Sequence, residues 1–481
     1  MVVDETNIPI GLTYNDVLII PKYSTISSRK SVNISTQLTP KIKLNIPMVS
    51  GNMDSVTESK MAIAMARVGG IGMIHRYMPI KNQVNEVLKV KRAEAILIEK
   101  PYTLTPEHNL KDAKIFMQEN NINGLLITDE VGRFKGILTR RDMMFEDNFL
   151  QPISEVMTSK DSAVVADYGV DIESAKKIMK QNKVEKLPLI DKNGLLKGLI
   201  TAKDLLRKEH YPLALKDNKG RLLVGAAIGV KGDYIERSEA LVEAGVNVLL
   251  IDIAHGHSEL CINAIKAVKD RFSDMEVIAG NIATEEAALD LINGGADCVK
   301  AGVGPGSICV TRLVAGAGYP QFSALLKCAK VGNEVGIPVM ADGGIGGMPG
   351  NFAKAIGAGA STVMRSRSLA GTDESPGIAI MRDGKKYKIY RGSASFGANM
   401  TRNERNSEKI DEEYNPEGVE ALVPYSGSVE EVIKPFLAGL KSGMSYVGAH
   451  NVKEFWNKVE FVRMTQAGVK ESYPHDVELV K

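Results

Sequence analysis

The chain has 481 residues, a formal net charge of +2 and four cysteines. Its length exceeds one ordinary domain and predicts two or three, while the near-neutral charge gives no reason to expect a nucleic-acid or anionic-membrane partner. There is no signal peptide, no apolar run of membrane-spanning length and too few cysteines for a disulfide scaffold, so we expect a globular protein of the reducing cytoplasm.

Short apolar runs that end in Gly, Asn or Asp and lead into helix-period stretches recur along the chain, as strands alternating with helices do. Eight such units predict an α/β fold, the (β/α)8 barrel. The expected strands are residues 47–51, 70–75, 222–227, 246–252, 277–281, 298–302, 338–344 and 361–365. The second and third strands are far further apart than any others. We therefore expect a barrel made of residues 1–92 and 212–481, interrupted by an insert at residues 93–211.

The insert contains an internal repeat. The string Gly-Ile-Leu-Thr-Arg-Arg-Asp at 136–142 recurs as Gly-Leu-Ile-Thr-Ala-Lys-Asp at 198–204. Each copy follows an apolar strand with a turn and, before that, an amphipathic helix near residues 110–120 or 172–182. A tandem β-α-β-β-α repeat with this string resembles a pair of CBS motifs, a Bateman module, at about residues 99–145 and 156–208.

In CBS proteins the Thr and Asp of the string hold the phosphate and ribose of adenine or guanine nucleotides. The resemblance therefore implies regulatory sites for ATP, GTP or GMP, with the ligands Thr139, Asp142, Thr201 and Asp204. The alternative is that each string is only a helix N-cap, because Thr caps helices well and Asp is favourable in the first turn.

The expected strands of the barrel are followed by polar residues at their C-terminal ends, where barrels of this type carry their catalytic groups. These residues are Asn52, Asp54, His75, Arg76, Asp252, Asn281 and Asp342. Gly-rich turns there can surround a phosphate with backbone amides, although such turns are also plain connections. The candidates for this anion site are Ser307, Gly343, Gly344 and Ser366.

The loop after the sixth expected strand reads Gly-Val-Gly-Pro-Gly-Ser-Ile-Cys-Val-Thr-Arg at residues 302–312. Its glycines favour a conformation that presents Cys309, and Arg312 or a helix N-terminus would lower the pKa of the thiol. The alternative is a small buried Cys in a turn. A nucleophilic Cys beside a phosphate site indicates covalent chemistry on a phosphorylated small molecule. The spacing of His255, His257 and Cys261 is poor for zinc.

Seven strings resemble the inosine monophosphate dehydrogenase and guanosine monophosphate reductase superfamily over nearly the whole chain. They lie at residues 13–19, 52–58, 252–258, 304–312, 341–345, 370–377 and 390–392. In that family the Cys attacks C2 of the purine, so the resemblance implies that Cys309 is the nucleophile and that Asp342 holds the ribose hydroxyls. The 5′-phosphate and other substrate contacts would fall on Ser307, Gly343, Gly344, Ser366, Arg367, Tyr390 and Asn52.

The resemblance also implies a nicotinamide site and a cation site. The nicotinamide side would be lined by Asp252, His255 and Asn281. Backbone carbonyls of Gly304, Gly306 and Cys309 are where the dehydrogenases hold a monovalent cation such as K⁺. Family members are homotetramers, and CBS modules pair them into octamers when purine nucleotides bind.

The two activities of the superfamily differ in the fate of the adduct. Dehydrogenases hydrolyse it with an Arg-Tyr pair on a mobile flap, expected here at residues 391–424, but this chain has Arg402-Asn403 and Arg405-Asn406 and no Arg-Tyr. Without the phenol, activation of water is impaired. Reductases use a Thr and a Glu to release ammonia, which Thr311 and Glu417 match, although dehydrogenases have both.

Two further strings, at 52–54 and 318–321, favour the reductase, and the string at 396–399 with Glu404-Arg405 resembles the flap of the long, CBS-containing reductases. The insert and the tail at 467–477 are more familiar from dehydrogenases. We therefore expect NADPH-dependent reduction of GMP to IMP and ammonia. The alternative is oxidation of IMP to XMP with NAD, and a minor alternative is a nucleotide sensor without catalytic activity.

One departure concerns the phosphate site. The chain has Met-Arg-Ser-Arg at 364–367, where the family usually has Met-Leu-Gly-Ser or Met-Leu-Gly-Gly. A Ser in place of Gly limits the approach of the backbone, while Arg365 or Arg367 could compensate with charge-assisted contacts to the phosphate. The alternative is that both arginines lie on the surface.

Overall fold

The computed structural model describes residues 8–93, 98–99, 101–120, 122–203, 205, 211–398 and 415–478. The chain divides into two compact units. The first contains Met1–Lys91, Leu213–Lys216 and Leu222–Lys481, and the second contains Arg92–Pro212 and Asp217–Arg221. Within the described residues, no helix is long and apolar enough to cross a membrane.

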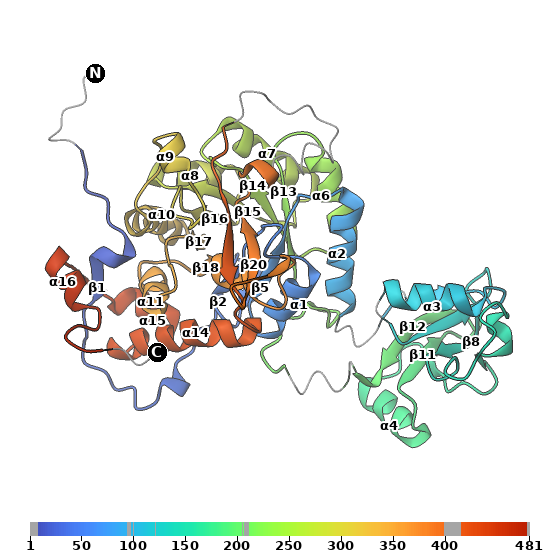
Figure 1. The fold of residues 1–481 in the computed structure, drawn as a ribbon. Helices are drawn as coiled ribbons and strands as arrows, with labels where there is room; N and C mark the ends of the chain where they lie inside the picture. Colours follow the sequence, from blue (N-terminus) through green and yellow to red (C-terminus); the bar gives the residue numbers. More distant parts are fainter. Residues whose placement is uncertain are drawn as a thin grey trace. The chain divides into compact units, whose positions relative to one another are not determined.

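Eight parallel strands of the first unit close into a barrel, which confirms the expected (β/α)8 fold (Figure 1). Around the barrel they are β4 (Met48–Ser50), β5 (Ile71–Ile74), β13 (Gly225–Ile228), β14 (Val248–Asp252), β15 (Glu276–Ile282), β16 (Cys298–Ala301), β17 (Val339–Asp342) and β18 (Thr362–Arg365). The strands are buried on both faces, as parallel strands covered by helices are. Each lies within or beside the stretch that the sequence predicted, and β13 begins three residues later than expected.

Alternate side chains of these strands fill the barrel, and a cluster of fully buried residues including Val49, Leu250, Met340 and Met364 occupies its interior. The following helices cover the outside: α1 (Ser59–Arg67), α2 (Ile80–Arg92), α6 (Tyr234–Glu243), α7 (Glu259–Arg271), α8 (Glu285–Asn293), α10 (Gln321–Val335) and α11 (Pro349–Gly357). Local signals set their ends. Thr284 caps α8 by accepting from the Ala287 amide, and Gly336 ends α10 in the left-handed conformation.

A helix and a three-stranded sheet from later in the chain also belong to the first unit. Helix α14 (Val429–Tyr446) packs against α11, and Ser428 caps it by accepting from the Glu431 amide. An antiparallel sheet contains β19 (Ala379–Arg382), β20 (Lys385–Arg391) and β21 (Glu420–Pro424). Strand β20 brings Tyr390 next to the barrel rim.

The second unit consists of two similar halves. The first has β6 (Thr103–Leu104), α3 (Leu110–Glu119), β7 (Gly124–Thr128) and β8 (Phe134–Thr139), with β9 (Thr158–Ser159) added to its sheet. The second has β10 (Ala166–Asp167), α4 (Ile172–Asn182), β11 (Lys186–Ile190) and β12 (Leu196–Thr201). The two hairpin turns exchange hydrogen bonds: Phe134 N–H donates to the Gly194 carbonyl, and Leu196 N–H donates to the Gly132 carbonyl, both at 3.0 Å.

Candidate active site

The loop between β16 and α9 (Thr311–Val314) presents Cys309. Its thiol is partly exposed, whereas Cys261, Cys298 and Cys328 are buried. Burial raises the pKa of Cys261 to about 11 and that of Cys328 to about 12, and it also raises the pKa of Cys298. A buried thiol with a raised pKa is inert, so Cys309 is the cysteine placed to react.

Glycine allows this loop to approach its neighbour. Gly302 has a φ of 146°, and a Cβ on it would lie 2.2 Å from the carbonyl oxygen of Asp342. An L side chain therefore does not fit at position 302. Arg312, expected to act on the thiol, donates instead to the carbonyls of Val303 and Tyr319 and so links the start of the loop to the segment after α9.

The structure brings Cys309, Thr311 and Glu417 into one hydrogen-bonded chain. The Thr311 hydroxyl donates to Glu417 Oε2 at 2.7 Å, and Cys309 Sγ lies 3.2 Å from Thr311 Oγ1. Because the single Thr311 proton points to the carboxylate, the thiol is the donor in the second contact. The backbone fixes this arrangement, since Val310 N–H donates to the Glu417 carbonyl at 2.8 Å and Val419 N–H to that of Ile308 at 3.0 Å.

Asp342 lies beside a buried lysine that the sequence reasoning missed. Lys300 on β16 has a side chain only 4% exposed, and its ammonium donates to Asp342 Oδ2 at 2.7 Å and also to Asn281. Asn281 in turn donates from Nδ2 to Asp342 Oδ2 at 2.9 Å and to the Gly302 carbonyl at 2.7 Å. Three adjacent strands thus fix one carboxylate oxygen, which leaves Oδ1 available to a ligand. A lysine inside the apolar run of 298–301 was the available signal.

Two serines from different turns meet at Tyr390. The hydroxyls of Ser307, in the Cys309 loop, and Ser366, after β18, both interact with the phenol and lower its pKa, and the phenol donates to Met53 Sδ at 3.8 Å. Burial raises the pKa of Tyr390 to about 12. The Ser366 hydroxyl also lies over Gly51, where a Cβ would approach its oxygen to 2.1 Å. The structure therefore brings together three of the expected phosphate-binding residues.

The Gly-Gly turn after β17 packs against the same loop. Gly343 and Gly344 have φ angles of 86° and 77°, and Gly344 N–H donates to the Pro305 carbonyl at 3.2 Å. A Cβ on Gly343 would lie 2.9 Å from Pro305 Cγ. The turn adjoins the anion candidates, but the Gly344 amide already has a protein partner.

The two arginines after β18 differ in exposure. Arg367 is exposed, whereas Arg365 is only 6% exposed. The alternative that placed both on the surface is therefore wrong for Arg365, because it is the last residue of β18 and its side chain lies against Phe436 of α14.

At the expected nicotinamide site, Asp252 is held by two neighbours from the loop after β5. Arg76 Nε donates to Asp252 Oδ2 at 3.1 Å, and the Tyr77 hydroxyl donates to the same atom at 3.2 Å. Burial, followed by the nearby Asp252, raises the pKa of Tyr77, so the phenol remains a donor. Asn281 lies instead with Asp342. His255 is exposed, while His257 pairs with Asp290 at 2.9 Å.

The residues expected to hold small cofactors fit them by donor type. Carbonyls of Gly304, Gly306 and Cys309 are suitable for a hard monovalent cation, and the Gly306 carbonyl also accepts the Cys309 amide at 3.2 Å. The free oxygen of Asp252 can accept from a hydroxyl or amide of a nicotinamide nucleotide.

Asn52, 5% exposed, lies in the loop after β4, whose Asp54 pairs with Arg391. A polar pocket of about 360 Å³ opens beside that pair. Its lining also holds the contact of Glu58 with His75 and the ion pair of Glu86 with Lys89. The flap residues Arg402 and Arg405 lie outside the described residues.

In the second unit, Thr139 and Asp142 bond to each other. Both the amide and the hydroxyl of Thr139 donate to Asp142 Oδ2, each at 2.7 Å. The residues after Thr139 form a turn and not a helix, so the helix N-cap alternative is not met at this copy, and Asp142 Oδ1 has no hydrogen bond among the described residues. Lys186 lies near Thr139, since a Cβ on Gly124 would be 3.1 Å from Lys186 Cε and 3.3 Å from Thr139 Cγ2. Thr201 ends β12, and Asp204 lies outside the described residues.

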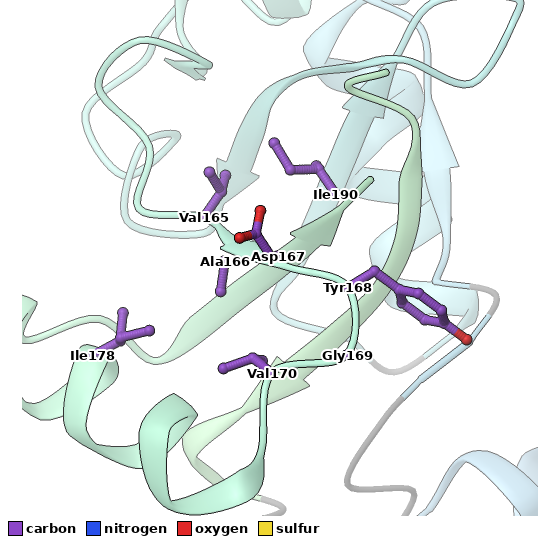
Figure 2. Close-up of a pocket in the computed structure, with 8 residues that line it drawn as sticks. All are labelled: Val165, Ala166, Asp167, Tyr168, Gly169, Val170, Ile178 and Ile190. Carbon is purple, nitrogen blue, oxygen red and sulfur yellow. The ribbon is translucent and has the colours of Figure 1, made fainter. Parts of the chain in front are cut away.

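A cavity of about 620 Å³ adjoins β10 in the second half of this unit. Figure 2 shows that the Ala166 methyl points toward Val170 and Ile178, whereas the Asp167 carboxylate points toward Val165 and Ile190. Tyr168 and Gly169 complete the lining. The lining side chains are thus mostly apolar, and the polar ones are the Asp167 carboxylate and the Tyr168 phenol.

Comparisons with known proteins agree with this architecture. The family model described as "IMP dehydrogenase / GMP reductase domain" matches residues 11–475. An inosine-5′-monophosphate dehydrogenase of Nitrosopumilus maritimus is 49% identical over 98% of this chain and 99% of its own length, and one of Aquifex aeolicus is 47% identical over 100% and 98%.

Solved structures of Trypanosoma brucei GMP reductase are similar in fold. A Cys-to-Ala variant in complex with guanosine 5′-monophosphate has a TM-score of 0.92 and 45% identity, covering 98% of this chain and 99% of that one. A complex with guanosine 5′-triphosphate has a TM-score of 0.81 and 40% identity, covering 96% and 99%. With its barrel, its rim cysteine and these matches along its length, the chain belongs to the IMP dehydrogenase / GMP reductase family of oxidoreductases.

Proposed function

We propose that this family member is a GMP reductase, which converts GMP to IMP and ammonia with NADPH. The sequence between Arg391 and Glu417 carries this choice, because it has no Arg-Tyr pair to activate water. The Cys309–Thr311–Glu417 hydrogen-bonded chain could transfer protons in either GMP reduction or IMP oxidation. Because the sequence has no Arg-Tyr pair to activate water, we favour its role in the release of ammonia from GMP.

The hydrogen-bond directions support a proton path. The Cys309 thiol gives its proton through Thr311 to Glu417, and the thiolate attacks C2 of GMP. The same proton then passes from Glu417 through Thr311 to the departing amino group, so that ammonia leaves as the C2–N bond breaks and a C2–S bond remains. A reduced nicotinamide bound on the Asp252 side would supply hydride to C2. The C2–S bond then breaks, Cys309 takes up a proton and IMP is released.

Substrate binding follows from the same geometry. Asp342 Oδ1 would accept from the ribose hydroxyls, while Lys300 and Asn281 hold the other oxygen in place. The 5′-phosphate would lie where Ser307, Ser366 and Tyr390 meet. This arrangement fixes C2 of the base relative to Cys309, which is what a reaction at one purine carbon requires.

The second candidate function is oxidation of IMP to XMP with NAD. It is favoured by the curated relatives at 49% and 47% identity, which carry that name. Thr311 and Glu417 would then move the proton of an attacking water instead of that of ammonia.

A direct assay separates the two functions. The purified full-length protein is mixed with GMP and NADPH, or with IMP and NAD, and the absorbance of the reduced nicotinamide is followed. We expect oxidation of NADPH with GMP and release of ammonia in equal amount. Robust reduction of NAD with IMP, without turnover of GMP, would overturn the reductase proposal.

We also propose that residues 93–211 form a tandem CBS module that binds purine nucleotides and regulates the barrel. This role is supported by the two similar halves, by Lys186 near Thr139 and by the mostly apolar pocket along β10. Titration of ATP, GTP and GMP against activity tests it, with sedimentation velocity to follow conversion of tetramers into octamers. An activity and an assembly that respond to none of the three nucleotides would contradict it.

A further inference from the structure

Arg365 is a buried cation on the outer face of the barrel wall. Its neighbour Met364 belongs to the cluster inside the barrel, so Arg365 points the opposite way, toward the covering helices. Its guanidinium lies 4.3 Å from the centre of the Phe436 ring on α14. With 6% exposure, the charge has lost nearly all of its water.

The protein satisfies this guanidinium only in part. Nη2 donates to the carbonyl of Gly346 at 2.9 Å, while Nε has no hydrogen-bond partner among the described residues. No carboxylate in the described part of the chain forms an ion pair with it. Burial lowers the pKa of Arg365 to about 10, and the like charge of Arg367 adds to this, but the side chain remains charged at neutral pH.

A buried charge without a counter-charge is costly, so its position needs an explanation. Arg365 directly precedes Ser366, whose hydroxyl meets Tyr390, and it interacts electrostatically with Tyr390 itself. Through Gly346 it also holds the turn that begins with Gly343 and Gly344. Two parts of the candidate phosphate site therefore adjoin the same guanidinium.

We infer that Arg365 is a positioning residue of the phosphate site, which supplies buried positive charge behind the groups that contact the phosphate and tethers the glycine turn beside it. The counter-charge that the described residues do not supply is then the substrate's phosphate dianion. This inference rests on the proposed function, because it requires a nucleoside monophosphate as the substrate. It also explains why this chain has an Arg at position 365, where the family usually has a Leu.

The test compares binding of GMP with binding of guanosine, which lacks the phosphate. Arg365→Leu restores the apolar residue usual in the family, and calorimetric titration of the full-length protein measures both ligands. We expect about a tenfold loss of GMP affinity with little change for guanosine, since only the phosphate carries the interacting charge. The loss should persist at high salt, because buried charges are weakly screened.

Arg365→Lys keeps the charge and should retain most of the preference for GMP over guanosine, which also covers the case that the Leu variant is unstable. Arg271→Leu is the matched control, since it removes one positive charge from an exposed ion pair on α7. If Arg365→Leu lost equal affinity for GMP and for guanosine, Arg365 would have only a packing role. If neither affinity changed, Arg365 would have no role in substrate binding. A wild-type protein that binds the two ligands equally well would instead count against the proposed function.

Discussion

Two threonines in this chain donate to a carboxylate at the same distance, in very different settings. Thr139 bonds to Asp142, three residues further along one turn, whereas Thr311 bonds to Glu417, which is 106 residues away. Local geometry alone produces the first bond, because a turn after the strand brings the carboxylate of Asp142 back to the hydroxyl of Thr139, three residues earlier. The second bond exists only because two distant segments are fixed side by side.

The difference separates what stabilises from what can catalyse. A short-range bond such as Thr139–Asp142 caps a turn whether or not a ligand is present. A long-range bond at a barrel rim, next to an accessible thiol, costs conformational entropy to form and adds little to the stability of the fold. Long-range polar contacts are therefore the better guide to the reaction site, and the following variants test this distinction.

Replacing Cys309 should have the largest effect. We expect Cys309→Ala to lower turnover by about three orders of magnitude or more, because no other group can form the covalent adduct. Initial rates with GMP and NADPH measure it. Cys261→Ala, which alters a buried thiol in α7, is the control, and turnover retained in the Cys309 variant would exclude covalent catalysis by this residue.

The Thr311–Glu417 bond should come next. Thr311→Val and Glu417→Gln should each lower kcat by about a hundredfold, because each interrupts the same proton path. The double variant should lose little more than either single one, since residues acting as a unit are not additive. Losses that multiply in the double variant would show that the two side chains act independently.

Lys300→Met tests a second long-range set. Without the ammonium, Asp342 loses a partner at 2.7 Å, and we expect KM for GMP to rise by about tenfold with a smaller change in kcat. Lys330→Met, which breaks an exposed pair with Glu285, is the comparison. A variant with kcat lowered and KM unchanged would place Lys300 in the chemical step.

The local bond should matter least to the enzyme. Thr139→Ala should cost about 1 kcal/mol of free energy of unfolding, the usual net value of one hydrogen bond, and weaken the response to purine nucleotides. Thermal unfolding and a nucleotide titration of activity measure these. A variant that is less stable but responds fully would show that Thr139 only stabilises its turn.

The sequence was sufficient for the barrel and insufficient for parts of the site. Apolar runs between turn residues located all eight strands, because buried parallel strands need continuous hydrophobic stretches. The polar residues of the rim could also be predicted, because the C-terminal ends of parallel strands all lie on one side of the barrel. The bonds of Lys300 to Asn281 and Asp342 depend on the relative register of three strands, which local patterns do not encode. Strand alternation from Met364 would have placed Arg365 outside the barrel, but not beneath Phe436.

The exchanged hydrogen bonds between the two hairpin turns of the second unit have a consequence for its evolution. The turn of each repeat accepts a hydrogen bond from the following strand of the other repeat: Gly194 from the Phe134 amide, and Gly132 from the Leu196 amide. An insertion in one turn would break both bonds at once, so the two copies must keep matching turn lengths even as their side chains diverge. The duplicated halves therefore inherit a common length while remaining free to acquire different ligands.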